Sequence, residues 1–255
     1  MKQTALITGA SSGIGLDLAH LFAADGHDVV LVARSEGKLR ELARELETKH
    51  DIKAQVIVAD LAKPDAPQQI FVVAPAVDIL VNNAGYGLSG KFAETDLRTE
   101  LDMIQVNISA LTHLTKLFLP PMLERGRGRI LNVASTASFQ PGPLMAVYYA
   151  TKAYVLSFSD AIGEELRGTG VTVTALCPGP TATGFQKVAE LGSEALLKIM
   201  RPVSSMDVAR AGYRGLMRGK RVVVPGMKNK IGVQSIRITP RALATKVVRA
   251  LQERR

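Results

Sequence analysis

The sequence predicts a doubly wound α/β fold, in which a parallel sheet is covered by helices on both faces. Two features predict it: short unbroken apolar runs alternate with longer helical patterns, and a glycine-rich turn follows the first apolar run directly. Strands that are buried on both faces appear as such unbroken runs, and intervening helices are typical of parallel strands. With 255 residues and an apolar fraction of 47%, the chain can fill the core of one such domain.

Seven apolar segments are expected to form the sheet, and no stretch between them has the composition of a linker rich in Pro, Gly or Ser. We therefore expect a single domain over 1–255, with a seven-stranded parallel sheet and helices on both faces. Amphipathic spacing predicts covering helices at 14–24, 36–49, 96–119 and 148–167. The expected strands are 4–8, 28–33, 55–59, 78–81, 129–134, 171–176 and 222–224.

The composition argues against several classes of protein. The single cysteine, Cys177, excludes an internal disulfide and fits a buried thiol in a reducing compartment. No apolar run reaches the ~18 residues of a membrane span, and the N-terminal run is too short for a secretory signal, so we expect a cytoplasmic protein. No metal is expected, because metal-ligand spacing is absent among His20, His27, His50 and His113.

The net charge of +9 is concentrated at the C-terminal end. Residues 218–255 hold eleven Lys and Arg against one acid, Glu253, whereas the rest of the chain holds 21 basic and 22 acidic residues. We treat 225–255 as a basic extension, in which 241–251 has helical spacing. Its apolar side either packs on its own domain or lies on an anionic membrane surface. Nucleic acid is not expected, since no recognised binding module accompanies the charge.

The glycine-rich turn has the properties of a phosphate-binding loop. It follows the first strand as Thr8-Gly9-Ala10-Ser11-Ser12-Gly13-Ile14-Gly15 and leads into the first helix. Gly9 permits a tight turn, Gly13 lets the backbone approach a pyrophosphate, and Gly15 allows close contact between helix and strand. The helix N-terminus offers free N–H groups to an anion. The spacing differs from the general G-x-G-x-x-G pattern, and a simple glycine-rich turn is the alternative.

The end of the second strand indicates which dinucleotide such a loop would bind. An acid at this position would hold a ribose 2′-hydroxyl, but the chain has Arg34, which is suited to a 2′-phosphate. NADP(H) is therefore favoured over NAD(H), unless Arg34 is only a solvated surface residue. Asp60, after the third strand, either accepts from an adenine amino group or caps the next turn.

A helical pair of Tyr and Lys suggests acid–base chemistry. Tyr148 and Lys152 are four residues apart and share a helix face, although Tyr149 is also within reach of the lysine. A nearby ammonium stabilises a phenolate, and lowering the phenol pKa by about three units corresponds to ~4 kcal/mol. We therefore expect Lys152 to lower the pKa of its tyrosine partner. Spacing alone does not choose between the two tyrosines, and packing is the alternative for the whole pair.

Several motifs together resemble the short-chain dehydrogenase/reductase family in its compact, single-domain, NADP-preferring form. They are TGASSGIG at 8–15, NNAG at 82–85, Asn107, Ser135, Tyr148-x-x-x-Lys152, and Pro178-Gly179 followed by Thr183. All occur in the family's order, and the resemblance covers about 1–190. Because the family's serine lies thirteen residues before its tyrosine, Ser135 selects Tyr148 over Tyr149. The resemblance implies a Rossmann fold.

The resemblance implies a role for each matching residue. Tyr148 would be the general acid or base, and Lys152 would lower its pKa and hold the nicotinamide ribose. Ser135 would polarise the substrate oxygen, and Asn107 would hold a water in a proton relay. Cofactor-binding residues would be Gly9, Ser11, Ser12, Gly13, Ile14, Gly15, Arg34, Asp60, Leu61, Asn82, Ala84, Gly85, Tyr148, Lys152, Pro178, Gly179, Thr181 and Thr183.

The implied function is an NADP(H)-dependent oxidoreductase that interconverts a carbonyl and an alcohol. The expected substrate walls are apolar, which favours a steroid-like, 3-oxoacyl or xenobiotic compound. A loop at 181–205 is expected over the substrate, and the C-terminal segment would close the pocket or meet another subunit of a homodimer or homotetramer, whose usual contacts are the helices at 96–119 and 148–167. The expected wall residues are Tyr86, Leu88, Phe139, Met145 and Phe185, with Val188 and Leu191.

Two alternatives belong to other classes. The first is a non-catalytic dinucleotide-binding sensor or scaffold with the same fold, which would have no need of Ser135, Tyr148 and Lys152. The second is a membrane-surface protein that acts through its basic tail.

Overall fold

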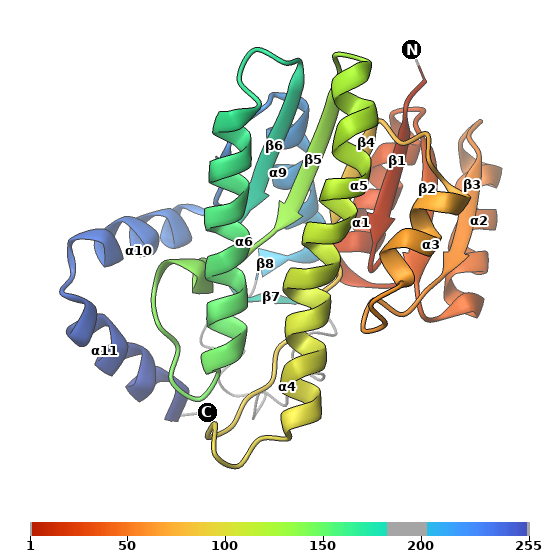
Figure 1. The fold of residues 1–255 in the computed structure, drawn as a ribbon. Coiled ribbons are helices and arrows are strands. Elements are labelled where there is room, and N and C mark those ends of the chain that lie inside the picture. Colours follow the sequence, from red (N-terminus) through yellow and green to blue (C-terminus); the bar gives the residue numbers. More distant parts are fainter. Residues whose placement is uncertain (1, 183–202, 254–255) are drawn as a thin grey trace.

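A computed structural model describes residues 2–182 and 203–253 and contains a seven-stranded parallel sheet (Figure 1). The strand order is β3-β2-β1-β4-β5-β6-β9, and all neighbouring strands run parallel, which confirms the expected sheet. A second, two-stranded sheet pairs β7 with β8. The strands are β1 Thr4–Thr8, β2 Asp28–Ala33, β3 Ala54–Val58, β4 Ile79–Asn82, β5 Gly128–Val133, β6 Val171–Leu176, β7 Thr181–Ala182, β8 Val203–Ser204 and β9 Val222–Val223.

Helices cover both faces of the large sheet and bury a large apolar cluster on each side, with a smaller third cluster under α5 and α6. One layer contains α1, α2 and α9, and the other contains α3, α5 and α6, with α4 leading into α5 (Figure 1). Each layer excludes water from one face of the central strands, which are apolar on both sides for that reason. These helices are α1 Gly13–Ala24, α2 Glu36–Lys49, α3 Ala66–Val73, α4 Leu97–Ile104, α5 Leu111–Glu124, α6 Ala146–Glu165 and α9 Ser205–Met217.

The observed helices differ from the predicted ones at one interrupted helix and at three additional helices. The single helix expected at 96–119 is interrupted by a π-helical segment, η1, at Gln105–Ala110. Three helices were not expected: α3, α9 and α10, the last of which spans Met227–Ile238. The short α3 begins at Ala66, after the N-cap residue Asp65, with a proline in its first turn, and eight residues do not display a periodic pattern long enough to recognise.

A buried polar network joins the centre of the sheet to the two long helices. Asn82, the last residue of β4, donates from Nδ2 to Asn132 Oδ1 on β5 at 2.9 Å and to Thr115 Oγ1 on α5 at 3.1 Å. Asn132 in turn donates to Ser159 Oγ on α6 at 2.9 Å. All four side chains are buried, so their hydrogen bonds exclude competing water. The network fixes α5 and α6 against the strand ends that carry the site.

The basic extension forms two helices beside the α/β layers. Helix α10 extends past α6 and away from the sheet, and helix α11, Arg241–Glu253, runs back to the start of α6 (Figure 1). The expected helix at 241–251 is therefore present. Packing of its apolar side on the domain is not observed, because Leu243, Val247 and Leu251 are all exposed.

Loss of the Asn82–Asn132–Ser159 network should destabilise the fold. We expect Asn132→Leu to lower the free energy of unfolding by about 1–3 kcal/mol, because it leaves a buried Asn82 N–H without its acceptor. Urea denaturation measures the change. Gln55→Leu, on the exposed side of edge strand β3, is the control and should stay within about 0.5 kcal/mol of the unmodified protein. Equal stabilities of the two variants would contradict the prediction.

Candidate active site

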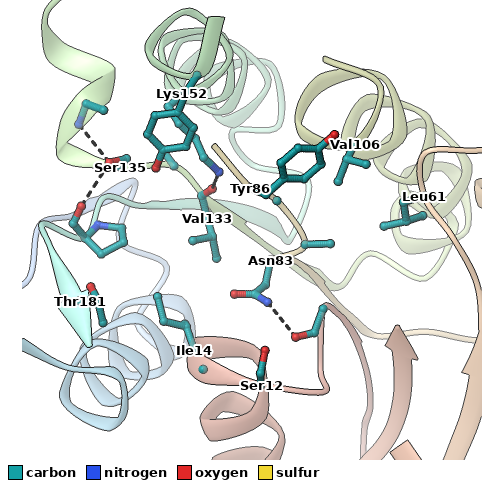
Figure 2. Close-up of a pocket in the computed structure, with 18 of the residues that line it drawn as sticks. Ser12, Ile14, Leu61, Asn83, Tyr86, Val106, Val133, Ser135, Lys152 and Thr181 are labelled. Carbon is teal, nitrogen blue, oxygen red and sulfur yellow. Dashed lines mark hydrogen bonds between the residues drawn. The ribbon is translucent and has the colours of Figure 1, made fainter. Parts of the chain in front are cut away.

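A cavity of about 640 Å³ opens at the carboxyl ends of the central strands. It lies where the strand order reverses between β1 and β4, the point at which open parallel sheets bind their ligands. Residues from the ends of β2 and β5 and from the loops after β1, β4 and β6 line it, so segments far apart in sequence meet there (Figure 2).

The glycine loop forms one wall of the cavity and leaves the N-terminus of α1 open. Gly9 and Gly13 adopt positive φ values of 67° and 56°, which glycine tolerates and other residues rarely adopt. Ser12 is the N-cap residue of α1, but its side chain makes no capping hydrogen bond. The first N–H groups of α1 are thus available to an anion beside Ser11, Ser12, Gly13 and Ile14, which all line the cavity. This wall fits a pyrophosphate.

Asn83 and Thr8 hold the glycine loop in place. Asn83 Nδ2 donates to the carbonyl oxygens of Thr8 at 2.9 Å and Gly9 at 3.3 Å (Figure 2). Thr8 Oγ1 accepts from the backbone N–H groups of Asn83 and Ala84, both at 3.0 Å. A Cβ on Gly9 would lie 2.8 Å from Asn83 Nδ2, so only glycine fits this approach of the two loops. The ends of β1 and β4 are therefore fixed relative to each other.

Tyr148 and Lys152 lie on the first turns of α6, and both line the cavity. Figure 2 shows Lys152 beside Val133. The ammonium of Lys152 is buried, donates to the carbonyl oxygen of Val133 at 2.8 Å, and lies 6.0 Å from the centre of the Tyr148 ring. Ser138 Oγ donates to the backbone carbonyl of Lys152 at 2.7 Å, which joins α6 to the segment after β5. Tyr148 and Lys152 therefore both lie beside the carboxyl end of β5.

Burial dominates the pKa values of this pair. Desolvation raises the pKa of Tyr148 to about 12, against a smaller lowering by its hydrogen bond with Ser135. Desolvation also lowers the pKa of Lys152 to about 8. The expected lowering of the Tyr148 pKa by Lys152 is therefore not found in the protein without a ligand, because the cost of burying a phenolate exceeds its stabilisation here. Tyr148 is a protonated acid at neutral pH.

Ser135 follows β5 and is placed by the 3₁₀ turn η2, Thr136–Phe139. Its hydroxyl oxygen accepts from the N–H of Ala137 at 3.0 Å and lies 3.5 Å from the carbonyl oxygen of Pro178 (Figure 2). Since it also hydrogen-bonds Tyr148, the hydroxyl is next to the group that carries the acidic proton. A substrate oxygen placed between these two hydroxyls could accept from both.

Asn107 lies in the π-helical segment η1, a feature that often marks functional sites. Its Nδ2 donates to the carbonyl oxygen of Tyr86 and to Thr151 Oγ1, both at 3.0 Å, and its Oδ1 accepts from the N–H of Tyr86 at 3.2 Å. A Cβ added to Gly85 would meet both Asn107 Oδ1 and Lys152 Nζ. Asn107 therefore fixes the loop after β4 close to the buried ammonium, behind the surface of the cavity.

Arg34, which is expected from the sequence to contact a 2′-phosphate, lies at one end of the cavity. It is exposed, lines the cavity at the end of β2, and forms no ion pair with an acid within the described ranges 2–182 and 203–253. Asp60 and Leu61 line the same end of the cavity. Asp60 Oδ1 accepts from the N–H of Ala62 at 3.1 Å, so this residue does cap the following turn.

Some residues expected at the site lie elsewhere. Asn82 is buried inside the sheet and Gly15 packs against the carbonyl of Gly9, so neither lines the cavity, although both support its walls. Leu88 does not line it either, and Phe139 lines a neighbouring cavity of about 660 Å³ instead. The sequence pattern located these segments correctly but could not give the direction of each side chain. Four expected residues lie outside the described residues: Thr183, Phe185, Val188 and Leu191.

Apart from Asn107, which lies behind the surface, the remaining expected residues that the structure describes do line the cavity, and the structure adds others. Tyr86, Ala84, Gly85, Met145, Pro178, Gly179 and Thr181 are in place. Asn83, Gln140, Tyr149 and Gln252 line it as well. Gln252 comes from α11, is buried, and donates from Nε2 to Tyr149 Oη at 3.0 Å. No sequence signal near Gln252 indicates this contact, which joins positions 103 residues apart.

Comparisons with known proteins agree with this geometry. The family model described as short chain dehydrogenase matches residues 3–193. The Monensin polyketide synthase putative ketoacyl reductase of Streptomyces virginiae is 42% identical over 203 residues, which cover 76% of this chain and 76% of that protein.

Two solved structures resemble the whole fold. The short-chain dehydrogenase from Sphingobium yanoikuyae in complex with NADPH has a TM-score of 0.84 and 32% identity, and the alignment covers 92% of this chain and 93% of that one. A short chain dehydrogenase/reductase from Burkholderia phymatum in complex with NAD has a TM-score of 0.82 and 26% identity, with 91% and 92% coverage.

The chain therefore belongs to the short-chain dehydrogenase/reductase family. It is an oxidoreductase of the carbonyl/alcohol type with a site for a nicotinamide dinucleotide.

The raised pKa of Tyr148 can be measured directly. A folded-state pKa above the ordinary value of 10.0 means that the phenol keeps its proton at pH values where exposed tyrosines ionise. In the cofactor-free protein, phenolate absorbance up to about pH 10 should therefore be the same with and without Tyr148→Phe. An additional phenolate in the unmodified protein at or below that pH would contradict the prediction and restore the expected effect of Lys152.

Proposed function

We propose that the protein is an NADP(H)-dependent reductase of hydrophobic carbonyl compounds. The observation that carries the proposal is that one cavity is lined by Tyr148, Lys152 and Ser135 together with the glycine loop and Arg34. The three side chains supply acid chemistry, whereas the glycine loop and Arg34 suit a phosphorylated dinucleotide. The reverse reaction, oxidation of the alcohol, uses the same groups.

The residues of this chain would hold the cofactor at three points. The open N-terminus of α1 suits the pyrophosphate, and Arg34 suits a 2′-phosphate. The third point is the segment after β6, where Pro178 and Thr181 line the cavity together with Tyr148 and would border the nicotinamide. When bound, the nicotinamide supplies a hydride. Both NADPH and NAD occur in complexes of the similar structures, so Arg34 is the feature that favours NADP(H).

The acid chemistry follows from the pKa values. Tyr148 keeps its proton at neutral pH and can give it to the carbonyl oxygen as negative charge develops there. Ser135 donates a hydrogen bond to the same oxygen and so orients the carbonyl. The phenolate formed on Tyr148 is stabilised by the Lys152 ammonium, which remains charged at neutral pH because its pKa is about 8. Asn107, in this proposal, serves the proton path towards Lys152 by holding a water beside Gly85.

The lining of the substrate side favours an apolar compound. Met145 and Tyr149 line the cavity with Tyr148, and the ring centres of Tyr148 and Tyr149 are 6.0 Å apart. The similarity to a ketoacyl reductase makes a 3-oxoacyl thioester the first substrate class to test, before steroid-like and xenobiotic carbonyls. By family resemblance, we also propose a homo-oligomer with contacts on α4, α5 and α6, where Leu97 and Leu101 are exposed.

Replacing Tyr148 should abolish turnover without abolishing cofactor binding. We expect Tyr148→Phe to lower kcat/KM for NADPH-dependent reduction by about 10²–10⁴-fold, since the proton donor to the carbonyl oxygen is lost. NADPH consumption over a panel of 3-oxoacyl thioesters, ketones, aldehydes and quinones measures it. Tyr154→Phe is the control, because Tyr154 is on the same helix but does not line the cavity. If no compound is turned over while NADPH still binds, the sensor function becomes the better proposal.

Replacing Arg34 should change cofactor choice. Loss of charge-assisted hydrogen bonds to a 2′-phosphate should weaken NADPH binding by about 10–100-fold in Arg34→Ala and leave NADH binding unchanged. Isothermal titration with each dinucleotide measures this, and NADH is the internal control. An unchanged NADPH affinity would show that Arg34 does not bind the 2′-phosphate.

A further inference from the structure

The outer faces of α10 and α11 combine exposed apolar and basic side chains, and we call them the tail surface. Its six large apolar residues are between 50% and 87% exposed, although residues of this type are usually buried. A cluster of such residues on a monomer surface usually marks a binding site. The apolar residues are Met227, Ile231, Ile238, Leu243, Val247 and Leu251.

On α10 the apolar side chains point directly away from the protein. Met227, Ile231 and Ile238 recur at helical spacing on one face, whereas Val233, on the opposite face, is the buried residue of this helix. Lys228 lies to one side of the apolar stripe and Lys230 to the other, and both are exposed. The helix thus presents an apolar stripe with a lysine on either side.

On α11 the apolar stripe also lies beside, and not on, the face that contacts the protein. Leu243, Val247 and Leu251 are spaced by four residues and are exposed, while Ala244 and Gln252 are buried. Packing on the domain therefore does not account for the amphipathic pattern of this helix. Two helices in sequence thus each expose an apolar stripe.

The charge of the tail surface is nearly all of one sign. All six of its basic residues are exposed, and Glu253 is the sole acid on the two helices as far as the structure describes them. Glu253 pairs with Arg249 at 2.7 Å, which leaves Lys228, Lys230, Arg237, Arg241 and Lys246 facing solvent. A second copy of the same surface would bring these charges together, whereas an anionic lipid surface would neutralise them.

We propose that the tail surface docks on the surface of an anionic lipid bilayer. The apolar stripes of α10 and α11 would enter the boundary between head groups and acyl chains, while the Lys and Arg side chains contact lipid phosphates. The binding is to the surface, since no helix among the described residues is long and apolar enough to cross a bilayer. The proposal does not depend on the proposed reaction.

Docking would place the catalytic cavity next to the membrane. Gln252 lines that cavity and contacts Tyr149, whereas the preceding residue, Leu251, belongs to the exposed stripe. One helix therefore connects the proposed lipid contact to the wall of the site, as Figure 1 shows for the position of α11 beside the start of α6. A hydrophobic substrate dissolved in the bilayer would have a short path to the cavity.

Vesicle flotation of the full chain tests the proposal. The protein should float with phosphatidylcholine vesicles that contain phosphatidylglycerol, and much less with phosphatidylcholine alone or at high salt. A triple variant, Ile231→Ser, Ile238→Ser and Leu243→Ser, should bind at least about tenfold more weakly, because less apolar area enters the bilayer. The control is Val58→Ser, Val72→Ser and Val73→Ser, which removes equally exposed side chains from β3 and α3 and should bind like the unmodified protein.

A charge variant tests the contact of the Lys and Arg side chains with lipid phosphates. Lys228→Gln, Arg237→Gln and Lys246→Gln together should weaken binding to the anionic vesicles by about a hundredfold, since each cation contributes about a factor of five to six. Two results would overturn the proposal. One is the absence of flotation with anionic vesicles at low salt. The other is a dimer in solution, measured by light scattering, that the triple serine variant dissociates, because a second copy would then occupy the tail surface.

Discussion

The site depends on the buried hydrogen bonds that join Asn82, Asn132 and Ser159. These bonds tie the carboxyl ends of β4 and β5 to α6, which carries Tyr148 and Lys152. A buried polar network has strict geometry, because each donor has lost its alternative partner in water. The position of the phenol relative to the strand ends is consequently set by the core of the sheet. Asn82 thus positions the strand ends through hydrogen bonds inside the sheet and does not itself line the cavity.

Burial also determines the protonation of Tyr148 and Lys152. Removing Tyr148 and Lys152 from water favours the neutral form of both, so the phenol holds its proton more strongly and the ammonium less strongly than in water. In the proposed reaction the phenol would give this proton to the substrate oxygen, and the ammonium would stabilise the phenolate that results. A pKa argument from helical spacing alone omits this desolvation cost, which is the largest cause of the Tyr148 shift.

The C-terminal extension contacts both the cavity and the outer surface of the protein. Helix α11 contributes a buried glutamine to the cavity and an apolar stripe to the exterior. An amphipathic helix normally buries its apolar side on its own domain. Here the small residue Ala244 makes the contact and the large residues face outward, so the apolar pattern is free for an external partner.

The sequence by itself determined the sheet, its strands and the residues of the motifs, because continuous apolar runs and glycine turns express local constraints that do not need the rest of the chain. It did not determine the π-helical segment around Asn107, the inward direction of Asn82, the contact of Gln252 with Tyr149, or the exposure of Leu243 and Leu251. Each of these depends on which segments pack together across long sequence separations. Only the tertiary structure decides that packing, since a periodic pattern gives the apolar side of a helix but not the partner that covers it.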